Sequence, residues 1–264
     1  MTNLGLAIAR VTLVLLVALG PLWAWAATDV PATIGKVKAS IVAIGTYERT
    51  RDPPFQFLGT GFAVGDGTLV LTAAHALPPA TDPQRPATVS ILSPAPARDG
   101  REQAELREGR AIAVDAAMDV ALLKIDGPPL PALKLSDSGG VRDGYNVLIT
   151  GFPLGAALGP VPMSSRAMVA GITPVAVTPT RAADVDSSTL RRLSSGGYTV
   201  FQLDTTAQAA ASGSPAYDPD SGEVIGMVNV AAPRDPSSTR SAQPAAMPYA
   251  IPSRQLRAVL ERAR

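Results

Sequence analysis

The sequence predicts an all-β fold. Its 264 residues include 25 prolines and 23 glycines, scattered along the chain, and this suits a loop-rich β-protein better than a helical one. Short runs of β-forming residues alternate with turn residues, without a heptad pattern or a repeat of 20–50 residues. A hydrophobic content of 46% is enough for a sizeable core, in one large domain or two small ones.

Residues 1–26 differ in composition from the rest of the chain. Arg10 is their only charge, and an apolar run from Val11 to Trp25 follows it. Ala24-Trp25-Ala26 then gives a small-x-small cleavage site. These features predict a secretory signal peptide, cleaved before Ala27, and therefore a periplasmic or secreted protein.

Charge and cysteine content exclude several kinds of partner. Subtracting Arg10 from the 23 basic residues leaves 22 against 22 acidic residues in the mature chain, residues 27–264. A chain without net charge has no electrostatic reason to bind nucleic acid or an anionic membrane. One histidine and no cysteine cannot build the usual zinc site, so we expect no metal and no cofactor. Stable membrane insertion is expected only under the alternative that residues 4–26 remain as an inner-membrane anchor.

The one histidine, His75, follows a predicted β-hairpin. β-Forming residues in Gly59–Val64 and Thr68–Ala74 flank a Gly65-Asp66-Gly67 turn. Any histidine chemistry in this chain must therefore use the residue at the end of this hairpin. The alternative is a histidine that lies on a turn without a function.

Two further residues carry potential chemistry. Asp119 precedes the apolar strand predicted at residues 120–125, and a carboxylate buried there needs a partner because an unpaired buried charge is costly. Asp115 is the nearby competitor for this role. Ser212 follows a predicted strand and an eight-residue loop, although a serine next to Gly213 is also typical of a flexible linker.

The phrases around these residues resemble those of trypsin-like serine proteases, and most closely the bacterial HtrA/Deg group. Gly59–Phe62 and Leu71–His75 resemble the segment that carries the catalytic histidine. Asp119–Leu122 resembles the segment of the triad aspartate, and Asp115 lacks the Ala-Leu that should follow. Ser212–Pro215 resembles the nucleophile loop, except that Ser214 replaces a second glycine. Ala250-Ile251-Pro252-Ser253 resembles the closing phrase of the family.

The resemblance covers roughly residues 35–262 and implies a chymotrypsin-like double barrel. Two six-stranded antiparallel β-barrels would span about residues 36–127 and 144–252, and a short C-terminal helix would span residues 253–263. Residues 127–143 would connect the barrels. Because the chain stops after the helix, we expect no peptide-binding PDZ domain, which HtrA proteases usually carry.

Three smaller expectations concern the segments between the predicted strands. Residues 27–37 are expected to be a connecting segment, and residues 94–103 a turn-rich excursion. Ser253 is expected to cap the last helix. An apolar stripe on that helix should pack against the barrel: Leu256, Val259 and Leu260.

The resemblance implies a serine endopeptidase that acts on polypeptide substrates. His75 would be the base, Asp119 would orient it and Ser212 would be the nucleophile, with the amides of Ser212 and Ala210 as the oxyanion hole. Small or apolar residues would line the substrate pocket and favour small aliphatic side chains: Thr206, Ala207, Val228 and Ala231.

Ala210 departs from the family, because active members have glycine two residues before the nucleophile. The family geometry uses a positive φ there, which costs a residue with a Cβ roughly 1–2 kcal/mol. This departure motivates an alternative, a catalytically silent protease-like module that binds peptides or partners. An esterase is disfavoured because the Gly-x-Ser-x-Gly phrase of α/β-hydrolases is absent around Ser212.

Overall fold

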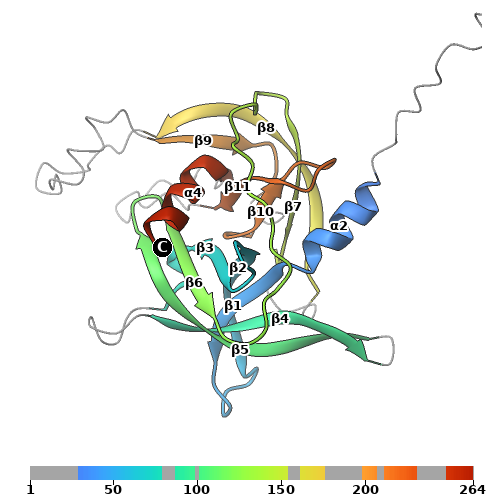
Figure 1. The fold of residues 1–264 in the computed structure, drawn as a ribbon, viewed down its shortest axis with the longest axis vertical. Coiled ribbons are helices and arrows are strands. Elements are labelled where there is room, and N and C mark those ends of the chain that lie inside the picture. The colour runs from blue at the N-terminus through green and yellow to red at the C-terminus, as the bar shows by residue number, and fades with distance from the viewer. Residues whose placement is uncertain are drawn as a thin grey trace, which may run out of the picture.

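The computed structural model shows two closed barrels of six antiparallel strands, with helices beside them (Figure 1). This confirms the predicted double-barrel fold. The structure describes residues 29–78, 87–98, 101–153, 161–175, 198–206, 211–230 and 248–263. None of the helices in these ranges is long and apolar enough to cross a membrane.

The N-terminal barrel has the strand order β1-β2-β3-β6-β5-β4. Its strands are β1 (Ile41–Tyr47), β2 (Phe55–Val64), β3 (Leu69–Ala73), β4 (Thr88–Arg98), β5 (Arg101–Asp115) and β6 (Val120–Ile125). The 3-10 turn η1 (Ala74–Ala76) follows β3 directly. The hairpin predicted before His75 is therefore formed by β2 and β3, with Phe62 opposite Leu71.

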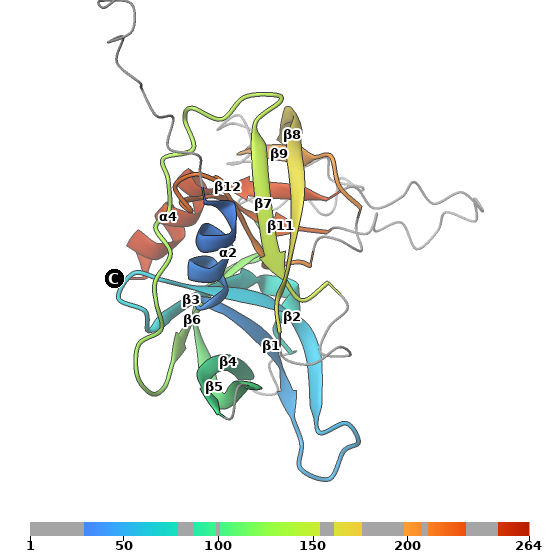
Figure 2. The same cartoon turned by 90° about the vertical axis from the view of Figure 1, so that its right-hand side faces the viewer.

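The C-terminal barrel has the strand order β10-β11-β12-β9-β8-β7. Its strands are β7 (Asn146–Gly151), β8 (Met163–Val175), β9 (Tyr198–Leu203), β10 (Pro215–Tyr217), β11 (Val224–Asn229) and β12 (Tyr249–Pro252). Figure 2 shows these strands above those of the N-terminal barrel.

Alternate residues of the strands divide between separate cores. Ile41 and Ala43 of β1 belong to a cluster that also includes side chains of the C-terminal barrel, whereas Val42 and Ile44 belong to a cluster within the N-terminal barrel. Successive side chains of a strand point to opposite faces, so these strands bury both faces. The near-continuous apolar runs at β1 and β6 follow from this double burial.

An N-terminal helix replaces the connecting segment that we expected at residues 27–37. The helix α2 spans Val30–Lys38, and the Asp29 carboxylate caps it by accepting a hydrogen bond from Ala32 N–H at 3.1 Å. Val37 is buried and packs into the core cluster shared by the two barrels. The expectation was wrong because a cap followed by an apolar i, i+3 spacing (Ile34 to Val37) was overlooked.

The expected turn-rich excursion at residues 94–103 is also wrong. The β4 and β5 strands continue through most of it as a long two-stranded ribbon, in which Pro94 lies opposite Ala104 (Figure 1). A proline cannot donate to a ladder, but it is tolerated where its nitrogen faces away from the partner strand. A ribbon with free outer edges offers such positions, so the prolines did not end the strand.

The C-terminal helix α4 (Ser253–Arg262) packs on the barrels with the predicted stripe, since Leu256, Val259 and Leu260 are buried. Ser253 does not cap it: its side chain makes no cap hydrogen bond, and its hydroxyl donates instead to the Val224 carbonyl. The serine therefore fastens the first turn of the helix to β11.

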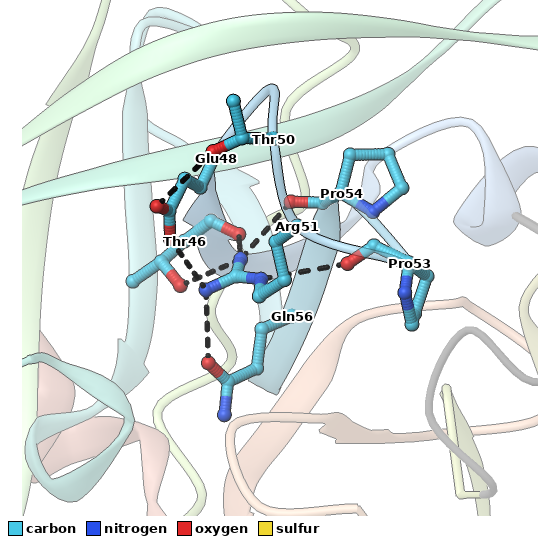
Figure 3. A network of polar contacts seen from close by, with 7 residues as sticks. All are labelled: Thr46, Glu48, Thr50, Arg51, Pro53, Pro54 and Gln56. Carbon is cyan, nitrogen blue, oxygen red and sulfur yellow. Dashed lines mark hydrogen bonds and ion pairs between the residues drawn. The ribbon is translucent and has the colours of Figure 1, made fainter.

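Two local networks hold loops in place. In the β1–β2 loop, the Arg51 guanidinium donates to the Thr46 carbonyl at 2.7 Å and to the Pro54 carbonyl at 3.0 Å (Figure 3). Between the barrels, Leu133 N–H donates to the Ala63 carbonyl at 2.9 Å, and the Lys134 carbonyl accepts from Val224 N–H at 2.8 Å. The connecting segment thus joins both barrels through its own backbone.

Candidate active site

His75 and Asp119 lie side by side although 44 residues separate them. The Asp119 Oδ2 atom is 2.6 Å from His75 Nδ1, and Asp119 Oδ1 accepts a hydrogen bond from the His75 backbone N–H at 2.8 Å. The backbones also pair, because Ala74 N–H donates to the Asp119 carbonyl at 3.1 Å. Both residues stand at the ends of adjacent strands, β3 and β6, which pair from Leu69–Lys124 to Ala73–Val120.

The turn that precedes Asp119 fixes this arrangement. Asp119 has a φ of 56°, in the left-handed region that aspartate tolerates better than most residues. The Asp115 Oδ1 atom accepts hydrogen bonds from Ala117 N–H at 3.2 Å and Met118 N–H at 3.1 Å, and so closes the turn. Its Oδ2 atom pairs with Arg262 at 3.3 Å. The two candidate carboxylates therefore have different partners, and it is Asp119 that contacts the histidine.

The hydrogen bonds to Asp119 determine the charge of its carboxyl group. Burial raises the pKa of the Asp119 carboxyl, but the hydrogen bonds from His75 and Asn229 more than offset it, so the pKa lies below its usual value of 3.8. The carboxylate is ionised near neutral pH and can only accept hydrogen bonds. His75 Nδ1 must therefore donate, and in a neutral imidazole the Nε2 atom then has the lone pair that can accept a proton.

Asn229 is a member of this cluster that the sequence reasoning missed. Its Nδ2 atom donates to Asp119 Oδ2 at 2.7 Å, and its side chain is almost fully buried, at 1% exposure. The residue was assigned only to the predicted strand at 222–230. A polar residue within the apolar predicted strand that follows Ser212 was the signal that could have found it.

Ser212 lies in a turn that both barrels hold. Its carbonyl accepts a hydrogen bond from Thr60 N–H of β2 at 3.0 Å, and Gly213 N–H donates to the Val228 carbonyl of β11 at 2.8 Å. Gly213 has a φ of 86°, and a Cβ on it would lie 1.9 Å from the Thr60 carbonyl oxygen. The turn thus requires glycine both for its conformation and for its close approach to β2.

A second glycine brings the histidine turn and the serine turn together. A Cβ on Gly59 would lie 2.8 Å from Ala76 Cβ and 3.5 Å from the Ser212 carbonyl oxygen. The residue after His75 and the backbone of Ser212 therefore contact the same glycine. The Ser212 hydroxyl oxygen accepts a hydrogen bond from Val230 N–H at 3.1 Å.

The remaining predicted site residues are less fully described. Thr206 is exposed, and Val228 is fully buried in the core cluster of the C-terminal barrel. Ala207, Ala210 and Ala231 lie outside the described residues, so the oxyanion hole and the substrate pocket stay predictions. Among the residues that the structure does describe, no group of three or more histidine, cysteine or acidic side chains could hold a metal ion.

Comparison with known proteins identifies several relatives. A protein from Pseudomonas putida is 35% identical over 100 residues, which are 38% of this chain and 18% of that protein. One from Halomonas elongata is 31% identical over 172 residues, 64% of this chain and 28% of that protein. One from Marinomonas sp. is 28% identical over 205 residues, 77% of this chain and 35% of that protein. Each is described as a probable periplasmic serine endoprotease, DegP-like. The matched part is thus about a fifth to a third of the length of these relatives.

A family model also matches more than half of the chain. The model of the trypsin-like peptidase domain matches residues 59–227, which include His75, Asp119 and Ser212. This range runs from β2 of the N-terminal barrel into β11 of the C-terminal barrel, so it contains strands of both barrels. The chain belongs to the trypsin-like peptidase family, and its similarity to DegP-like proteins supports a serine protease.

Proposed function

We propose that this protein is a serine endopeptidase that hydrolyses peptide bonds of exported or misfolded proteins. The observation that carries the proposal is the cluster at the barrel interface, where an ionised Asp119 fixes His75 and where the backbone of Ser212 contacts the same Gly59 as the histidine turn. This cluster contains the three groups that the chemistry of a serine protease requires: a serine nucleophile, its base and an acid that orients the base. The relatives described as periplasmic serine endoproteases support the same activity.

The chemistry begins with a proton transfer. Ser212 Oγ attacks the carbonyl carbon of the scissile bond while His75 Nε2 takes the hydroxyl proton, and the Asp119 carboxylate stabilises the imidazolium through Nδ1. The tetrahedral oxyanion would bind the amides of Ser212 and Ala210. His75 then gives its proton to the leaving amine, and a water molecule hydrolyses the acyl-enzyme by the same steps in reverse.

We also propose that the mature chain, residues 27–264, is one protease domain that works in the periplasm or outside the cell. The composition of residues 1–26 supports cleavage of a signal peptide, and the relatives are described as periplasmic. Mass spectrometry of protein from the native host should find Ala27 at the N-terminus. Intact Met1 in a membrane fraction would contradict this proposal and favour an anchor.

Removal of the nucleophile or the base tests the activity directly. Ser212→Ala and His75→Ala should abolish casein cleavage, because one variant lacks the nucleophile and the other lacks its base. Ser212→Ala should also abolish labelling by a fluorophosphonate probe, because it lacks the hydroxyl that the probe modifies. Ser214→Ala is the matched control, since this serine lies two residues away and is fully buried. Wild-type cleavage by the Ser212→Ala variant would refute the proposal.

A further inference from the structure

The nucleophile candidate and the base candidate are not hydrogen-bonded to each other. The Ser212 hydroxyl oxygen accepts from Val230 N–H at 3.1 Å, and within the described part of the chain no hydrogen bond joins this hydroxyl to the His75 ring. The other side of the ring is fully engaged, because Nδ1 contacts Asp119 at 2.6 Å. The acid–base pair is therefore assembled while the hydroxyl has a different partner.

The backbone around Ser212 is fixed, so a change of partner needs only its side chain. The Ser212 carbonyl is held by Thr60 N–H, Gly213 N–H is held by the Val228 carbonyl, and Ser214 N–H is held by the Ala211 carbonyl. A serine side chain has one heavy-atom torsion with three staggered wells. Rotation about this torsion can move the hydroxyl from one partner to another without moving the turn.

Two consecutive residues at the end of β11 contact both parts of the site. The Asn229 side chain donates to Asp119, and the backbone N–H of the next residue, Val230, donates to Ser212. Asn229 is buried and lies opposite Tyr249 of β12, so pairing with β12 holds this end of β11 in place. The same short segment thus holds the acid through a side chain and the nucleophile through the backbone.

We propose that Val230 N–H is a latch that keeps the Ser212 hydroxyl in a resting position away from His75. The inference rests on the proposed function, because it gives the resting form of that catalytic site. In this position the Ser212 hydroxyl oxygen accepts from Val230 N–H, and among the described residues the hydroxyl makes no hydrogen bond to the His75 ring. Catalysis requires the side chain to rotate so that the hydroxyl donates to Nε2.

The latch lowers the reactivity of the Ser212 hydroxyl without abolishing it. One neutral hydrogen bond biases an equilibrium by about 2- to 12-fold. Between about a tenth and a third of the molecules therefore have Ser212 directed at His75 at any time, and removal of the latch should raise the reactivity of the hydroxyl by about 2- to 12-fold. Asn229 meanwhile keeps Asp119 and His75 in place, so the base needs no rearrangement.

The single histidine allows a test that does not depend on activity. Nuclear magnetic resonance of the full mature chain compares the wild type with Ser212→Ala, following the His75 Nε2 signal and the Val230 amide signal. The latch predicts that the Val230 amide signal shifts and that the His75 Nε2 signal moves only by the share of the minor population. A Val230 amide signal that does not move, or a His75 Nε2 shift that corresponds to a hydrogen bond in more than about a third of the molecules, overturns the latch.

The second test removes the donor itself. Val230→Pro lacks the N–H, whereas Val230→Ala keeps it and is the matched control. Diisopropyl fluorophosphate should label the proline variant about 2- to 12-fold faster than the alanine variant. An equal or slower rate in a folded proline variant overturns the latch. If neither variant labels, the peptidase proposal fails, and the resonance comparison still decides the latch, as it does if the proline variant does not fold.

Discussion

The two barrels contribute to the site in different ways. In the N-terminal barrel, His75 and Asp119 stand at the ends of adjacent paired strands. Two hydrogen bonds join His75 to the Asp119 carboxylate, and a third runs from Ala74 N–H to the Asp119 carbonyl. In the C-terminal barrel, Ser212 stands on a turn whose carbonyl is held by the other barrel. The contact between His75 and Asp119 thus forms within one sheet, whereas Ser212, the candidate nucleophile, is placed by contacts between the barrels.

This difference predicts which substitutions change activity alone and which change activity and stability together. A side-chain change at His75 or Asp119 should affect the chemistry and leave the stability of the fold unchanged, because the strands beside them pair through their backbones. A change in the serine turn should affect stability and chemistry together, because the turn is part of the barrel interface. The variants below test this contrast, from the largest expected effect to the smallest.

Asp119→Asn should have the largest effect on the reaction. The amide is nearly the same shape, but it cannot stabilise a charged His75 and can favour the wrong tautomer, so kcat should fall about 10³–10⁴-fold near neutral pH. Circular dichroism and thermal unfolding should be close to those of the wild type. Asp115→Asn is the control, because Asp115 closes a turn and pairs with Arg262. An unchanged rate in Asp119→Asn would move the acid elsewhere.

Gly213→Ala should damage stability and activity together. The added Cβ would meet the Thr60 carbonyl oxygen at 1.9 Å, at a φ of 86°, and we expect a loss of about 2–4 kcal/mol in the free energy of unfolding. Gly140→Ala is the matched control, since a Cβ there would meet nothing within 4 Å, and it should change stability by less than about 0.5 kcal/mol. Denaturant unfolding measures both. Equal stabilities would mean that the serine turn adapts freely.

Asn229 gives an intermediate effect that separates charge from shape. Asn229→Ala removes a donor to Asp119 and should lower kcat about 10-fold, since a hydrogen bond to a charged group contributes about 1.5–3 kcal/mol, of which only part acts in the reaction. Asn229→Asp keeps the shape but puts a second carboxylate beside Asp119, and it should be worse than Asn229→Ala. If the role were only packing, Asn229→Asp would be the milder change.

The stability that the Asp119 hydrogen bonds provide should depend on pH only in the acid range. Because the folded pKa of Asp119 is lowered from 3.8, the stability that its hydrogen bonds provide is fully present above about pH 4 and is lost as the pH falls through the folded pKa. Asn229→Ala removes one of the hydrogen bonds that lower this pKa, so its acid-dependent loss of stability should be smaller and should end at a higher pH. Thermal unfolding from pH 2 to pH 7 compares the two. Coincident curves would contradict this account of Asp119.

Ser214→Ala should have the smallest effect, and a favourable one. The Ser214 hydroxyl is buried without a hydrogen-bond partner in the part of the chain that the structure describes. Its removal should raise the free energy of unfolding by about 1 kcal/mol. Thr150→Val is the contrasting control, because the Thr150 hydroxyl bonds to Ser164 and Tyr217 at 2.8 Å, and its loss should destabilise by about 1–2 kcal/mol. A loss of stability in Ser214→Ala would mean that the hydroxyl is paired.

Much of the fold could be predicted because its signals are local. The β2–β3 hairpin follows from two apolar runs around a Gly-Asp-Gly turn, and the apolar stripe of α4 follows from its spacing. The wrong predictions concern features that depend on neighbouring parts of the fold. Pro94 argued for a turn, and only the free edges of the β4–β5 ribbon make a strand possible there.

The site was predictable to a different degree in each barrel. His75, Asp119 and Ser212 were predicted from the short phrases around them, and the structure places the first two in contact. Asn229 was missed because nothing near it in sequence indicates that it faces Asp119, 110 residues earlier. The bond from Val230 to Ser212 could not be predicted at all, because it uses a backbone group that every residue except proline carries.

The hydrogen bond from Thr60 N–H to the Ser212 carbonyl has a consequence for biosynthesis. Thr60 belongs to the first barrel that is translated and Ser212 to the second, so the turn of the nucleophile gains this support only when the second barrel docks. A chain in which only the first barrel has folded would hold His75 and Asp119 together, and the turn of Ser212 would gain its support from Thr60 when the second barrel docks.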